Sequence, residues 1–301
     1  IGNKMQHTDI DLSVVILNYN TRRLLQSCLV SFRKFSSGIK YEIIVVDNNS
    51  TDGSDVLTRT EFPEILLLRN NKNTGYAKGN NRGISKSRGN NVLLLNSDTE
   101  LLDNSIKDCI DYLKTNKKIG VLSPNLINKD GTVQNFSCGY FPSIRTLFSQ
   151  FFFLSRFSCV LPVLKGLNKY SLNKSEYVDW VAGTCMFIKR EVLDKIGGLP
   201  EDYFMYFEDI DFCFQAKKAG FKVFFKHDSR VSHIGIGGAN SFSQRNEQKI
   251  EWTKSLIIFC KKNFKHRLQF IIAKFIVIIG FFLRVFLRMV TGIFYPAALK
   301  E

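Results

Sequence analysis

The sequence contains no pair of cysteines with the spacing C-x-x-C, and its seven cysteines are scattered along 301 residues. An odd and scattered set fits reduced thiols in a cytosolic setting better than a disulfide framework. Most of these cysteines are then expected to be small buried hydrophobic side chains. The first fifteen residues also contain no long apolar stretch, so we expect no export signal.

Familiar nucleotide-binding glycine patterns are absent as well. The chain contains neither G-x-G-x-x-G nor a Walker loop, which argues against a dinucleotide-dependent dehydrogenase and a P-loop NTPase. Instead, "NTGYAKGNNRGI" places Gly75, Gly79 and Gly83 four residues apart. Inside a helix each glycine costs about 1 kcal/mol relative to alanine. Close approach of a phosphate or of another backbone would explain that cost, and so would close helix packing.

Acidic residues are scarce relative to basic ones, with 27 against 42 and a net charge of +15. Such a surplus indicates a polyanionic partner or an anionic membrane surface. Residues 245–301 contain eleven basic and three acidic residues among many apolar ones, so about half of the surplus lies there. This distribution favours a membrane surface over a nucleic-acid groove, and we expect no nucleic-acid partner.

The sequence also lacks an uninterrupted apolar run of membrane-spanning length. Residues 268–295 come close to that length, but basic residues interrupt them, namely Lys274, Arg284 and Arg288. The longest uncharged run, residues 275–283, is far short of the roughly 20 apolar residues that a spanning helix needs. Because long basic side chains can reach water from a helix at the membrane surface, we favour a helix lying in the headgroup layer over a spanning one.

The first part of the chain alternates short apolar runs with helical patterns. The runs are rich in Ile, Val and Leu and cover residues 12–17, 42–46, 65–68 and 92–95. Between them lie helical patterns such as residues 21–32, where apolar side chains recur on one face and Thr21 is the expected N-cap. This alternation predicts an α/β fold with a doubly wound, largely parallel sheet.

Polar residues follow each of these predicted strands. They are residues 18–20, 47–54, 69–76 and 96–98. Because the loops after the strands of an open α/β sheet form one crevice, we expect these polar clusters to converge on one site.

The section from residue 120 to residue 226 is less regular. It predicts a strand over residues 181–189, a helix over residues 191–196 and a second helix over residues 209–219. Glycines follow both helices, as is usual at helix C-termini. An aromatic and apolar stretch, residues 147–164, either forms a core helix or helps to seat a lipid or dock to a membrane.

The run of leucines at residues 93–95 is followed by "NSD", which places a carboxylate at the end of a buried strand. Asp98 and Asn96 both offer oxygen to a hard divalent cation such as Mg²⁺ or Mn²⁺. The alternative is that Asp98 caps the next helix or begins a turn. His233, in "VSHIGIGGANS", follows another expected strand and is either a structural residue or a second metal ligand.

Two further stretches carry acidic residues with candidate roles. Asp47 begins "DNNSTDGS", where a carboxylate suits recognition of a ring N–H or a ribose hydroxyl; the alternative is a polar loop with Asx turns. In "YFMYFEDIDFC", Glu208, Asp209 and Asp211 lie among five aromatic residues. Poor solvation there would raise a carboxylate pKa and suit a general base, whereas acids at a helix N-terminus also favour stability alone.

Several stretches taken together resemble the inverting family-2 glycosyltransferases with the GT-A fold, and especially the bacterial rhamnosyltransferase-like branch. In order along residues 12–238 they are "VVILNYN", "VVDNNSTDGS", "NTGYAKGNNRGI", "LLLNSDTE", "WVAGTCMFIKREVLDKIGGLPEDYFMYFEDIDFC" and "HIGIGG". Each is modest evidence alone, whereas all of them in the right order are strong evidence. The resemblance implies a Rossmann-like, mostly parallel central sheet flanked by helices.

The resemblance also implies a nucleotide-sugar donor in the crevice and assigns roles to residues. Asp47 would lie near the nucleobase or ribose, and Asp209 would be the catalytic base. Asp98 and His233 would hold Mg²⁺ or Mn²⁺ at the donor diphosphate. The family's metal motif is often D-x-D, and this chain has Asn96 in the first place, so we assign metal ligation mainly to Asp98.

Two sets of residues complete these assignments. The expected donor-binding residues are Asn18, Tyr19, Asn20, Asp47, Asn49, Gly75, Asn80, Asn96 and Asp98. The expected acceptor-binding residues are Trp180, Gly183, Glu208 and Asp209. Residues 1–240 would form the glycosyltransferase domain, with residues 10–125 as its nucleotide-sugar-binding half and residues 126–240 as its acceptor-binding half. Residues 241–301 would form a basic, apolar helical segment that associates with a membrane.

We therefore expect a metal-dependent, inverting transfer of a sugar to a hydroxyl of a glycan acceptor by a single displacement. dTDP-rhamnose is the favoured donor and a UDP-sugar the next. A lipid-linked acceptor would explain the basic, apolar C-terminal segment. That segment would hold the enzyme at the cytoplasmic face of the bacterial cell membrane, peripherally or as an anchor, in cell-surface polysaccharide biosynthesis.

The sequence leaves two other functions open. A nucleotidyltransferase also uses an α/β crevice, a metal and a nucleotide, but it needs a basic loop near the first strand, where "NYNTRRLL" offers only Arg22 and Arg23. A membrane-bound, polyanion-binding protein without catalysis would explain the net charge of +15. Donor hydrolysis or transfer in a simple assay distinguishes that protein from an enzyme.

Overall fold

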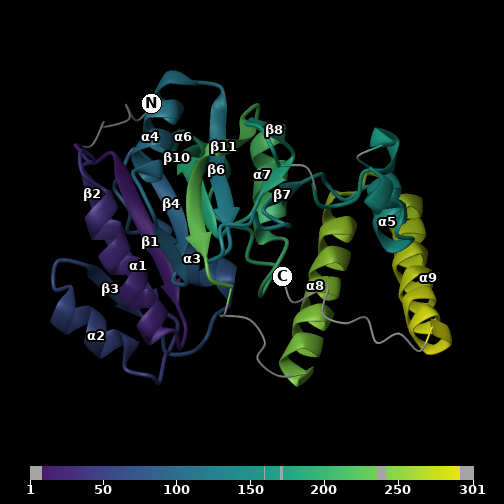
Figure 1. Ribbon diagram of the computed structural model, residues 1–301, viewed down its shortest axis with the longest axis horizontal. Coiled ribbons are helices and arrows are strands. Elements are labelled where there is room, and N and C mark those ends of the chain that lie inside the picture. Colours follow the sequence, from purple (N-terminus) through teal and green to yellow (C-terminus); the bar gives the residue numbers. More distant parts are fainter. Residues whose placement is uncertain (1–8, 159, 170–171, 236–241, 292–301) are drawn as a thin grey trace.

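A computed structural model of the chain describes residues 9–158, 160–169, 172–235 and 242–291. The central sheet lies at the left and centre of Figure 1, and helices α5 (Ile144–Phe151), α8 (Phe242–Asn263) and α9 (Arg267–Thr291) stand at the right. The expected boundary between residues 240 and 241 lies outside the described residues. So do the last three residues of the motif "HIGIGG" and the end of the apolar tail, residues 292–295.

Parallel strands form the first part of the sheet, in the spatial order β3, β2, β1, β4. They are β1 (Leu12–Asn18), β2 (Tyr41–Asp47), β3 (Leu66–Arg69) and β4 (Asn91–Asn96). Each coincides, to within one or two residues, with an apolar run that predicted it. The register places Asn18 opposite Asp47 and Asp47 opposite Arg69, so the polar residues at the strand ends are aligned.

Helices cover both faces of this part of the sheet. They are α1 (Arg22–Phe35), α2 (Ser54–Glu61), α3 (Tyr76–Ile84) and α4 (Ser105–Thr115). Val15 of β1 packs in one core with Ala77 of α3, whereas its neighbour Ile16 packs in the other core with Leu29 of α1 and Ile106 of α4. Alternate strand residues point to opposite faces, so the doubly wound arrangement follows directly from the apolar runs.

Thr21 occupies the N-cap position of α1 but does not cap the helix with its side chain, contrary to our prediction. Its hydroxyl donates to Asn18 Oδ1 at 2.6 Å instead. The N–H of Arg22 donates to the carboxylate of Asp52, in the loop after β2, at 2.8 Å. The loop after β2 therefore supplies an acceptor for an N–H group at the start of α1. This hydrogen bond also joins the loops that follow β1 and β2.

The regularly spaced glycines of α3 are explained by close packing. A Cβ atom at Gly83 would lie 2.4 Å from a methyl group of Val15, and one at Gly79 would lie 2.4 Å from a methyl group of Leu17. Gly75 has a φ of +81°, and a Cβ atom there would lie 2.4 Å from a backbone carbonyl oxygen of another loop. The helix can approach β1 this closely only without side chains at these positions.

The sheet continues beyond β4 with strands from the second half of the chain. They are β5 (Thr99–Leu101), β6 (Ile119–Ile127), β8 (Glu176–Val178), β10 (Cys185–Lys189) and β11 (Lys222–His233). β10 is antiparallel to both β4 and β6, and β11 is parallel to β6. β4, β6 and β11 therefore run in the same direction, so the ends of β4 and β11 meet at the same edge.

The predicted strand over residues 181–189 is wrong in one respect, because it is interrupted. β9 (Trp180–Val181) pairs with β7 (Cys138–Gly139) in a separate sheet, and β10 begins only at Cys185. The physical reason is a close approach at Gly183, where a Cβ atom would lie 2.7 Å from the hydroxyl oxygen of Tyr76. The chain leaves the strand there to make contacts that a regular ladder would not allow.

The remaining helices pack at the end of the sheet. α6 (Arg190–Ile196) and α7 (Glu208–Lys218) confirm the two helices predicted in this section. α8 buries Leu256 and Phe259 in the same core as Phe212 of α7. Residues 147–164 form the end of α5 and the short turns η1 (Leu154–Phe157) and η2 (Pro162–Leu164), so they are not one core helix. α5 packs along α9.

Candidate active site

The ends of β4 and β11 bring Asp98 and His233 together. Asp98 lies in the turn between β4, which ends at Asn96, and β5, and His233 is the last residue of β11. Asp98 is 6% exposed, and its Oδ1 atom is 3.2 Å from His233 Nε2. The backbone holds the pair, because the N–H of Ile234 donates to the carbonyl oxygen of Asp98 at 2.9 Å. Metal binding by the pair stays a prediction.

A glutamine that the sequence did not single out, Gln134, holds the ring of His233. Gln134 Nε2 donates to the carbonyl oxygen of His233 at 2.7 Å and to Asn128 Oδ1 at 2.8 Å. This orientation leaves Gln134 Oε1 to face His233 Nδ1, at 2.8 Å. Because an amide oxygen only accepts hydrogen bonds, Nδ1 carries a proton, and Nε2 is the ring nitrogen that faces Asp98.

The pair fits a divalent cation. A carboxylate oxygen and an imidazole lone pair 3.2 Å apart attract each other only through a proton or a cation between them. Neighbouring ligands of an octahedral ion with bonds of about 2.1 Å are roughly 3.0 Å apart, close to this spacing. In the described part of the chain, no group of three or more His, Cys, Asp and Glu side chains could hold a metal. Further ligands would have to come from a bound substrate and from water.

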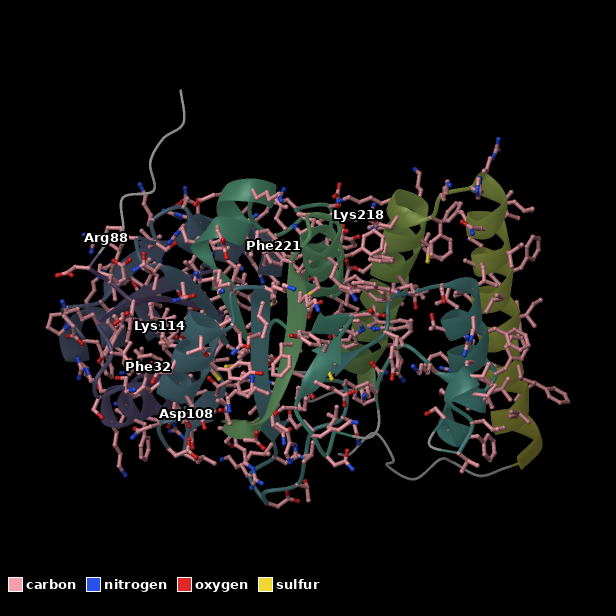
Figure 2. All side chains as sticks on the ribbon, turned by 90° about the horizontal axis from the view of Figure 1, so that it is seen from above. Phe32, Arg88, Asp108, Lys114, Lys218 and Phe221 are labelled. Atoms are coloured by element: carbon pink, nitrogen blue, oxygen red, sulfur yellow. The ribbon has the colours of Figure 1, made fainter. Side chains whose placement is uncertain are left out.

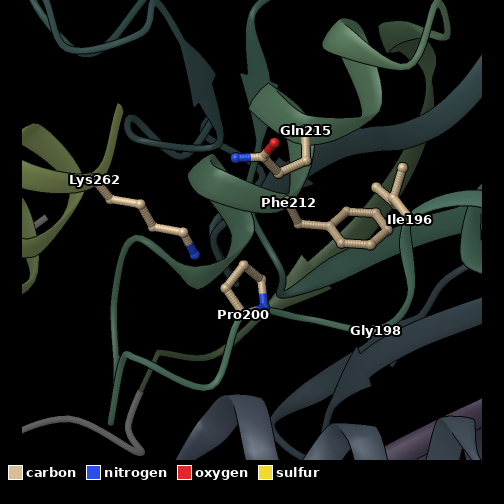
Figure 3. A pocket seen from close by; sticks show the side chains of 6 residues that line it. All are labelled: Ile196, Gly198, Pro200, Phe212, Gln215 and Lys262. Atoms are coloured by element: carbon tan, nitrogen blue, oxygen red, sulfur yellow. The ribbon is translucent and has the colours of Figure 1, made fainter. Parts of the chain in front are cut away.

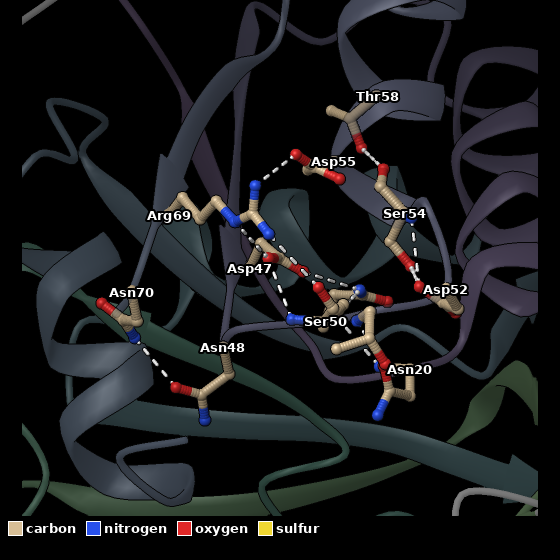
Figure 4. Close-up of polar contacts among 12 residues, drawn as sticks. Asn20, Asp47, Asn48, Ser50, Asp52, Ser54, Asp55, Thr58, Arg69 and Asn70 are labelled. Carbon is tan, nitrogen blue, oxygen red and sulfur yellow. Dashed lines mark hydrogen bonds and ion pairs between the residues drawn. The ribbon is translucent and has the colours of Figure 1, made fainter. Parts of the chain in front are cut away.

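Asp47 lies inside the loop that follows β2 and is 1% exposed (Figure 4). Its Oδ2 atom accepts from the N–H of Ser50 at 3.1 Å and is 3.6 Å from Arg69 Nε. Its Oδ1 atom accepts from Asn18 Nδ2 at 3.3 Å, and Arg69 also pairs with Asp55 at 2.7 Å. Asp47 therefore organises the strand ends, and its recognition of a nucleobase or ribose stays a prediction.

The other predicted donor-binding residues differ in exposure. Tyr19, Asn20 and Asn49 are exposed on the loops at the strand ends, whereas Asn18 and Asn80 are buried. Asn20 and Asn49 have φ values of 53° and 71°, a left-handed conformation that asparagine tolerates better than most residues. Asn80 Nδ2 donates to a backbone carbonyl of its own helix at 3.0 Å. The exposed three are thus the ones free to meet a ligand directly.

Asp209 lies in the first turn of α7, directly after Tyr206 and Phe207 and the buried Glu208. Tyr206 and Phe207 have φ values of 69° and 67°, so the backbone before the helix is strained. Asp209 is partly exposed and accepts hydrogen bonds from the N–H groups of Gly183 at 2.9 Å and of the next residue at 2.8 Å. Burial raises the pKa of Asp209, and these hydrogen bonds lower that pKa in part.

Glu208 differs from Asp209 in its surroundings. It is 5% exposed, and its Oε2 atom has no hydrogen-bond partner among the described residues. Burial raises the pKa of Glu208 well above its ordinary value, and the negative charge of Asp209 raises that pKa further. Because the N–H groups stabilise a charge on Asp209, the negative charge of the pair is favoured there. Asp209 is therefore the better candidate for a general base.

The backbone of Gly183 connects Asp209 to α3. The N–H of Gly183 donates to the carboxylate of Asp209, and the carbonyl oxygen of Gly183 accepts from the hydroxyl of Tyr76 at 2.7 Å. Tyr76 is the first residue of α3, so this single residue joins the two halves of the chain at the candidate base.

The same connection also contacts the end of β4. The carbonyl oxygen of Thr184 accepts from the N–H of Asn96 at 2.9 Å, two residues before Asp98. Gly183 and Thr184 therefore contact Asp209 on one side and the end of β4, two residues before Asp98, on the other. A shared site for Asp98 and Asp209 stays a prediction.

Asp211 serves a different purpose from the other two acids. It is fully buried and accepts hydrogen bonds from the hydroxyl of Tyr203 and from Asn263 Nδ2, each at 3.1 Å. Lys262 Nζ lies 2.9 Å from Asp211, and Gln215 Nε2 donates to it at 3.0 Å. Lys262 and Gln215 also line a cavity between α6, α7 and α8 (Figure 3). That cavity is part of the helix interface that Asp211 holds together.

Trp180, which the sequence proposed as an acceptor contact, is 4% exposed. Its indole N–H lies 3.2 Å from the carbonyl oxygens of Tyr140 and Leu167. Trp180 thus supports the short strand β9, and a contact with an acceptor stays a prediction. Phe204 is 46% exposed, and its carbonyl oxygen accepts from the N–H of Tyr76 at 2.8 Å, so it is an aromatic side chain within reach of solvent beside the site.

Sequence reasoning missed Gln134, Tyr76 and Arg69. Nothing in "TVQNF" indicates that Gln134 will meet His233, 99 positions later. Tyr76 lies inside a motif that the sequence did single out, and Arg69 begins the polar cluster that follows a predicted strand. A search for every hydrogen-bonding side chain in those motifs would have found the last two, but no local signal marks Gln134.

Known proteins resemble this chain over most of its length. Residues 13–197 match the profile of the family described as glycosyl transferase family 2. A Haloferax volcanii protein named low-salt glycan biosynthesis hexosyltransferase Agl10 is 31% identical over 226 residues, which cover 73% of this chain and 66% of that protein. A Mycobacterium tuberculosis protein named N-acetylglucosaminyl-diphospho-decaprenol L-rhamnosyltransferase is 28% identical over 243 residues, which cover 75% of this chain and 76% of that protein.

Solved structures at lower identity share the fold. The mannosyltransferase PcManGT from Pyrobaculum calidifontis, in complex with GDP-Man and Mn²⁺, superposes with a TM-score of 0.58 at 16% identity, over 86% of this chain and 66% of that one. S. aureus TarS, in complex with UDP, superposes with a TM-score of 0.56 at 18% identity, over 89% of this chain and 70% of that one. They confirm the predicted GT-A-like arrangement of a mostly parallel central sheet flanked by helices.

Proposed function

The chain belongs to glycosyl transferase family 2, and we propose that it transfers a sugar from a nucleotide-sugar donor to a hydroxyl group of a glycan acceptor, with inversion. The observation that carries this proposal is that residues 182–184 contact both Asp209 and the end of the strand before Asp98. Such a transfer needs a group that stabilises the departing diphosphate and a base for the acceptor hydroxyl. Asp98 and Asp209 would supply these two groups on either side of this short connection.

On the donor side, Asp98 and His233 would hold Mn²⁺ or Mg²⁺. A divalent cation bound there would stabilise negative charge on the departing nucleoside diphosphate. The Mn²⁺ in the PcManGT complex supports the use of a divalent ion. The loop organised by Asp47 would receive the nucleobase or ribose, with Tyr19 and Asn20 on its exposed side.

On the acceptor side, Asp209 would remove the proton of the attacking hydroxyl. Its partial exposure allows a hydroxyl to reach it, while the N–H groups of Gly183 and Ile210 hold the carboxylate in one orientation. Burial raises the pKa of Asp209, which makes it a stronger base than an exposed carboxylate. Attack from the face opposite the leaving group in a single displacement inverts the anomeric centre.

We expect Asp209→Asn to abolish transfer, because the amide cannot take up the proton. General-base catalysis typically contributes about 10²- to 10⁴-fold, so the rate should fall by at least that factor while donor affinity stays unchanged. Transfer would be measured by release of the nucleoside diphosphate and donor affinity by calorimetry. Asp194→Asn, the same change at an exposed position of α6, is the control and should keep full activity. An active Asp209→Asn enzyme would overturn the assignment.

We expect Asp98→Ala to weaken binding of the nucleoside diphosphate in the presence of Mn²⁺. Interactions with charged groups are worth about 1.5–3 kcal/mol, which corresponds to roughly 10- to 100-fold in affinity. Calorimetric titration with and without EDTA measures the effect, and EDTA should reduce the difference between variant and parent. Equal affinities in Mn²⁺ would exclude a metal role for Asp98.

The donor is expected to be dTDP-rhamnose, with UDP-hexoses next. The names of the mycobacterial rhamnosyltransferase and of the Haloferax hexosyltransferase support this order. Because a ligand that binds the folded state stabilises it by mass action, about 2.7 kcal/mol at 100 times the dissociation constant, the true donor should raise the melting temperature most in Mn²⁺. A panel of nucleotide sugars in a thermal-shift assay tests this. A GDP-sugar that stabilises more than both candidates would contradict the choice.

The acceptor is expected to be a lipid-linked glycan intermediate in cell-surface polysaccharide biosynthesis. The diphospho-decaprenol in the name of the mycobacterial relative and the apolar C-terminal helix support this choice. The enzyme would then work at the cytoplasmic face of the bacterial cell membrane. Within the chain, we assign residues 10–125 to donor binding, residues 126–240 to acceptor binding and residues 241–301 to the membrane. Family membership argues against the nucleotidyltransferase and the non-catalytic polyanion-binding protein.

A further inference from the structure

One side of α9 exposes large apolar side chains along the length of the helix. Leu268, Phe275, Phe282 and Met289, each seven residues apart, form one stripe and are 66%, 60%, 69% and 76% exposed. The stripe extends over about 32 Å of helix. By length and composition residues 267–287 could cross a membrane. Only 22% of the most apolar window is buried inside the protein, so the rest of the chain leaves most of this window uncovered. An exposed apolar surface of this size indicates a binding partner.

Arg284, one of the basic residues that interrupt this helix, is turned inward. Arg284 Nη2 donates to the carbonyl oxygen of Gln150 at 2.8 Å, and its guanidinium lies 5.0 Å and 5.1 Å from the ring centres of Phe151 and Phe153. Arg284 therefore binds the segment beneath α9. The stripe is less interrupted by charge than the sequence alone suggested.

A second set of exposed apolar residues belongs to the segment that includes α5, the helix packed against α9. It consists of Phe148, Phe157, Val160, Leu161 and Val163, which are 46%, 59%, 80%, 52% and 55% exposed. These residues belong to α5 and the turns after it, and α5 packs along α9 in both views of the molecule (Figures 1 and 2). We call the stripe and this set together the apolar face.

The position of α8 decides how the apolar face meets a membrane. α8 runs beside α9 and carries exposed lysines at Lys249, Lys254 and Lys261 (Figure 1). Ser255 Oγ of α8 donates to the carbonyl oxygen of Met205 at 2.8 Å, so α8 contacts the loop that precedes α7. If α9 crossed the bilayer along its axis, these lysines would enter the hydrocarbon, which is costly.

We propose that the apolar face binds the surface of an anionic lipid bilayer, with α9 in the plane of the membrane and not across it. Such helices bury their apolar side about 5–10 Å deep. The surplus of basic residues after position 244, eleven against three acids, matches the charge of anionic headgroups. A second protein copy would not explain that surplus, so we choose lipid as the occupant. This proposal concerns the location of the enzyme and is separate from its reaction.

Depth measurements test the orientation. The full-length chain would carry Leu268→Trp, Phe275→Trp, Phe282→Trp or Met289→Trp, and quenching by lipids brominated at different depths would be recorded in phosphatidylglycerol vesicles, with the parent protein as background. A helix in the plane predicts one shallow depth for all positions. A spanning helix would give deep values for the middle two and shallow values for the ends, and absent quenching would exclude insertion; either result would overturn the proposal.

A loss-of-binding variant separates this proposal from the proposed reaction. Phe275→Glu combined with Phe282→Glu should weaken vesicle binding by about tenfold or more, whereas Val56→Glu, at an equally exposed apolar position of α2, should not. Transfer to a soluble acceptor analogue should remain in both variants. Unchanged vesicle binding, or a parent protein that dimerises through this face in solution, would contradict the lipid partner.

A different observation carries a second inference, which rests on the proposed metal-dependent function. Gln134 uses its N–H₂ group on His233 O and Asn128 Oδ1, so its oxygen must accept from His233 Nδ1. We propose that Gln134 is a positioning residue that fixes the ring of His233 with Nδ1 towards Gln134 Oε1 and Nε2 towards Asp98. Without this contact the ring could rotate, and Nε2 would no longer be held beside the carboxylate as a second metal ligand.

Gln134→Leu tests this role with readouts that need no turnover. The nitrogen chemical shifts of ¹⁵N-labelled histidine should report the hydrogen bond at Nδ1 of His233 in the parent protein and its loss in the variant, with His227 as an internal reference. Mn²⁺ affinity in the presence of UDP should fall about 10- to 100-fold. Gln134→Glu, which keeps an oxygen acceptor for Nδ1, should retain the hydrogen bond at Nδ1.

Two results would contradict the assignment to Gln134. One is an unchanged Nδ1 chemical shift of His233 in Gln134→Leu, and the other is a changed shift with unchanged Mn²⁺ affinity. If the parent protein itself bound no Mn²⁺ with UDP, the proposed metal dependence would fail, while the chemical shifts would still report on Gln134.

Discussion

The site depends on the two backbone hydrogen bonds of one residue, Gly183. The N–H of Gly183 donates to Asp209, and its carbonyl oxygen accepts from the hydroxyl of Tyr76. A side chain at this position would collide with that hydroxyl, so only glycine allows the approach. Gly183 holds the candidate base in place and joins it to α3, the helix that begins after the third strand. Its neighbour Thr184 extends the same support to the end of β4.

Burial divides the three neighbouring acids into different roles. Asp211 is fully satisfied by α8 and the loop before α7, so it stabilises the packing of helices. Glu208 and Asp209 share a poorly solvated position, but the N–H groups of Gly183 and Ile210 stabilise charge on Asp209. Because an unpaired buried carboxylate favours its neutral form, Glu208 can lie beside Asp209 without competing with it for the negative charge. The strained backbone at Tyr206 and Phe207 presents the pair at the start of the helix.

The C-terminal helices are part of the same packed body as the site. Lys262 and Asn263 at the end of α8 bind Asp211 in α7, and Ser255 binds the loop before α7. α9 packs against α5, and Arg284 joins them through Gln150. A membrane surface that binds α9 would therefore hold α7, and with it Asp209, at a defined distance from the lipid. This arrangement suits a reaction whose acceptor remains attached to a membrane.

The sequence by itself determined the strands, the two-sided helical cover and the polar edge of the sheet. These features depend on local periodicity and on which residues follow each apolar run, and both can be read along the chain. It also singled out Asp98, His233 and Asp209, because acidic and imidazole groups stand out beside apolar strands and aromatic residues. Metal binding and catalysis by these residues are still predictions.

Only the tertiary structure decided which side chains support that site and which serve packing. The interruption at residues 182–184, the hold of Gln134 on His233 and the inward turn of Arg284 all arise from contacts between segments about 100 or more positions apart. No local pattern encodes such a contact, because its partner is defined by how the elements pack. The sequence therefore specified the groups that carry the chemistry, and packing specified their orientation.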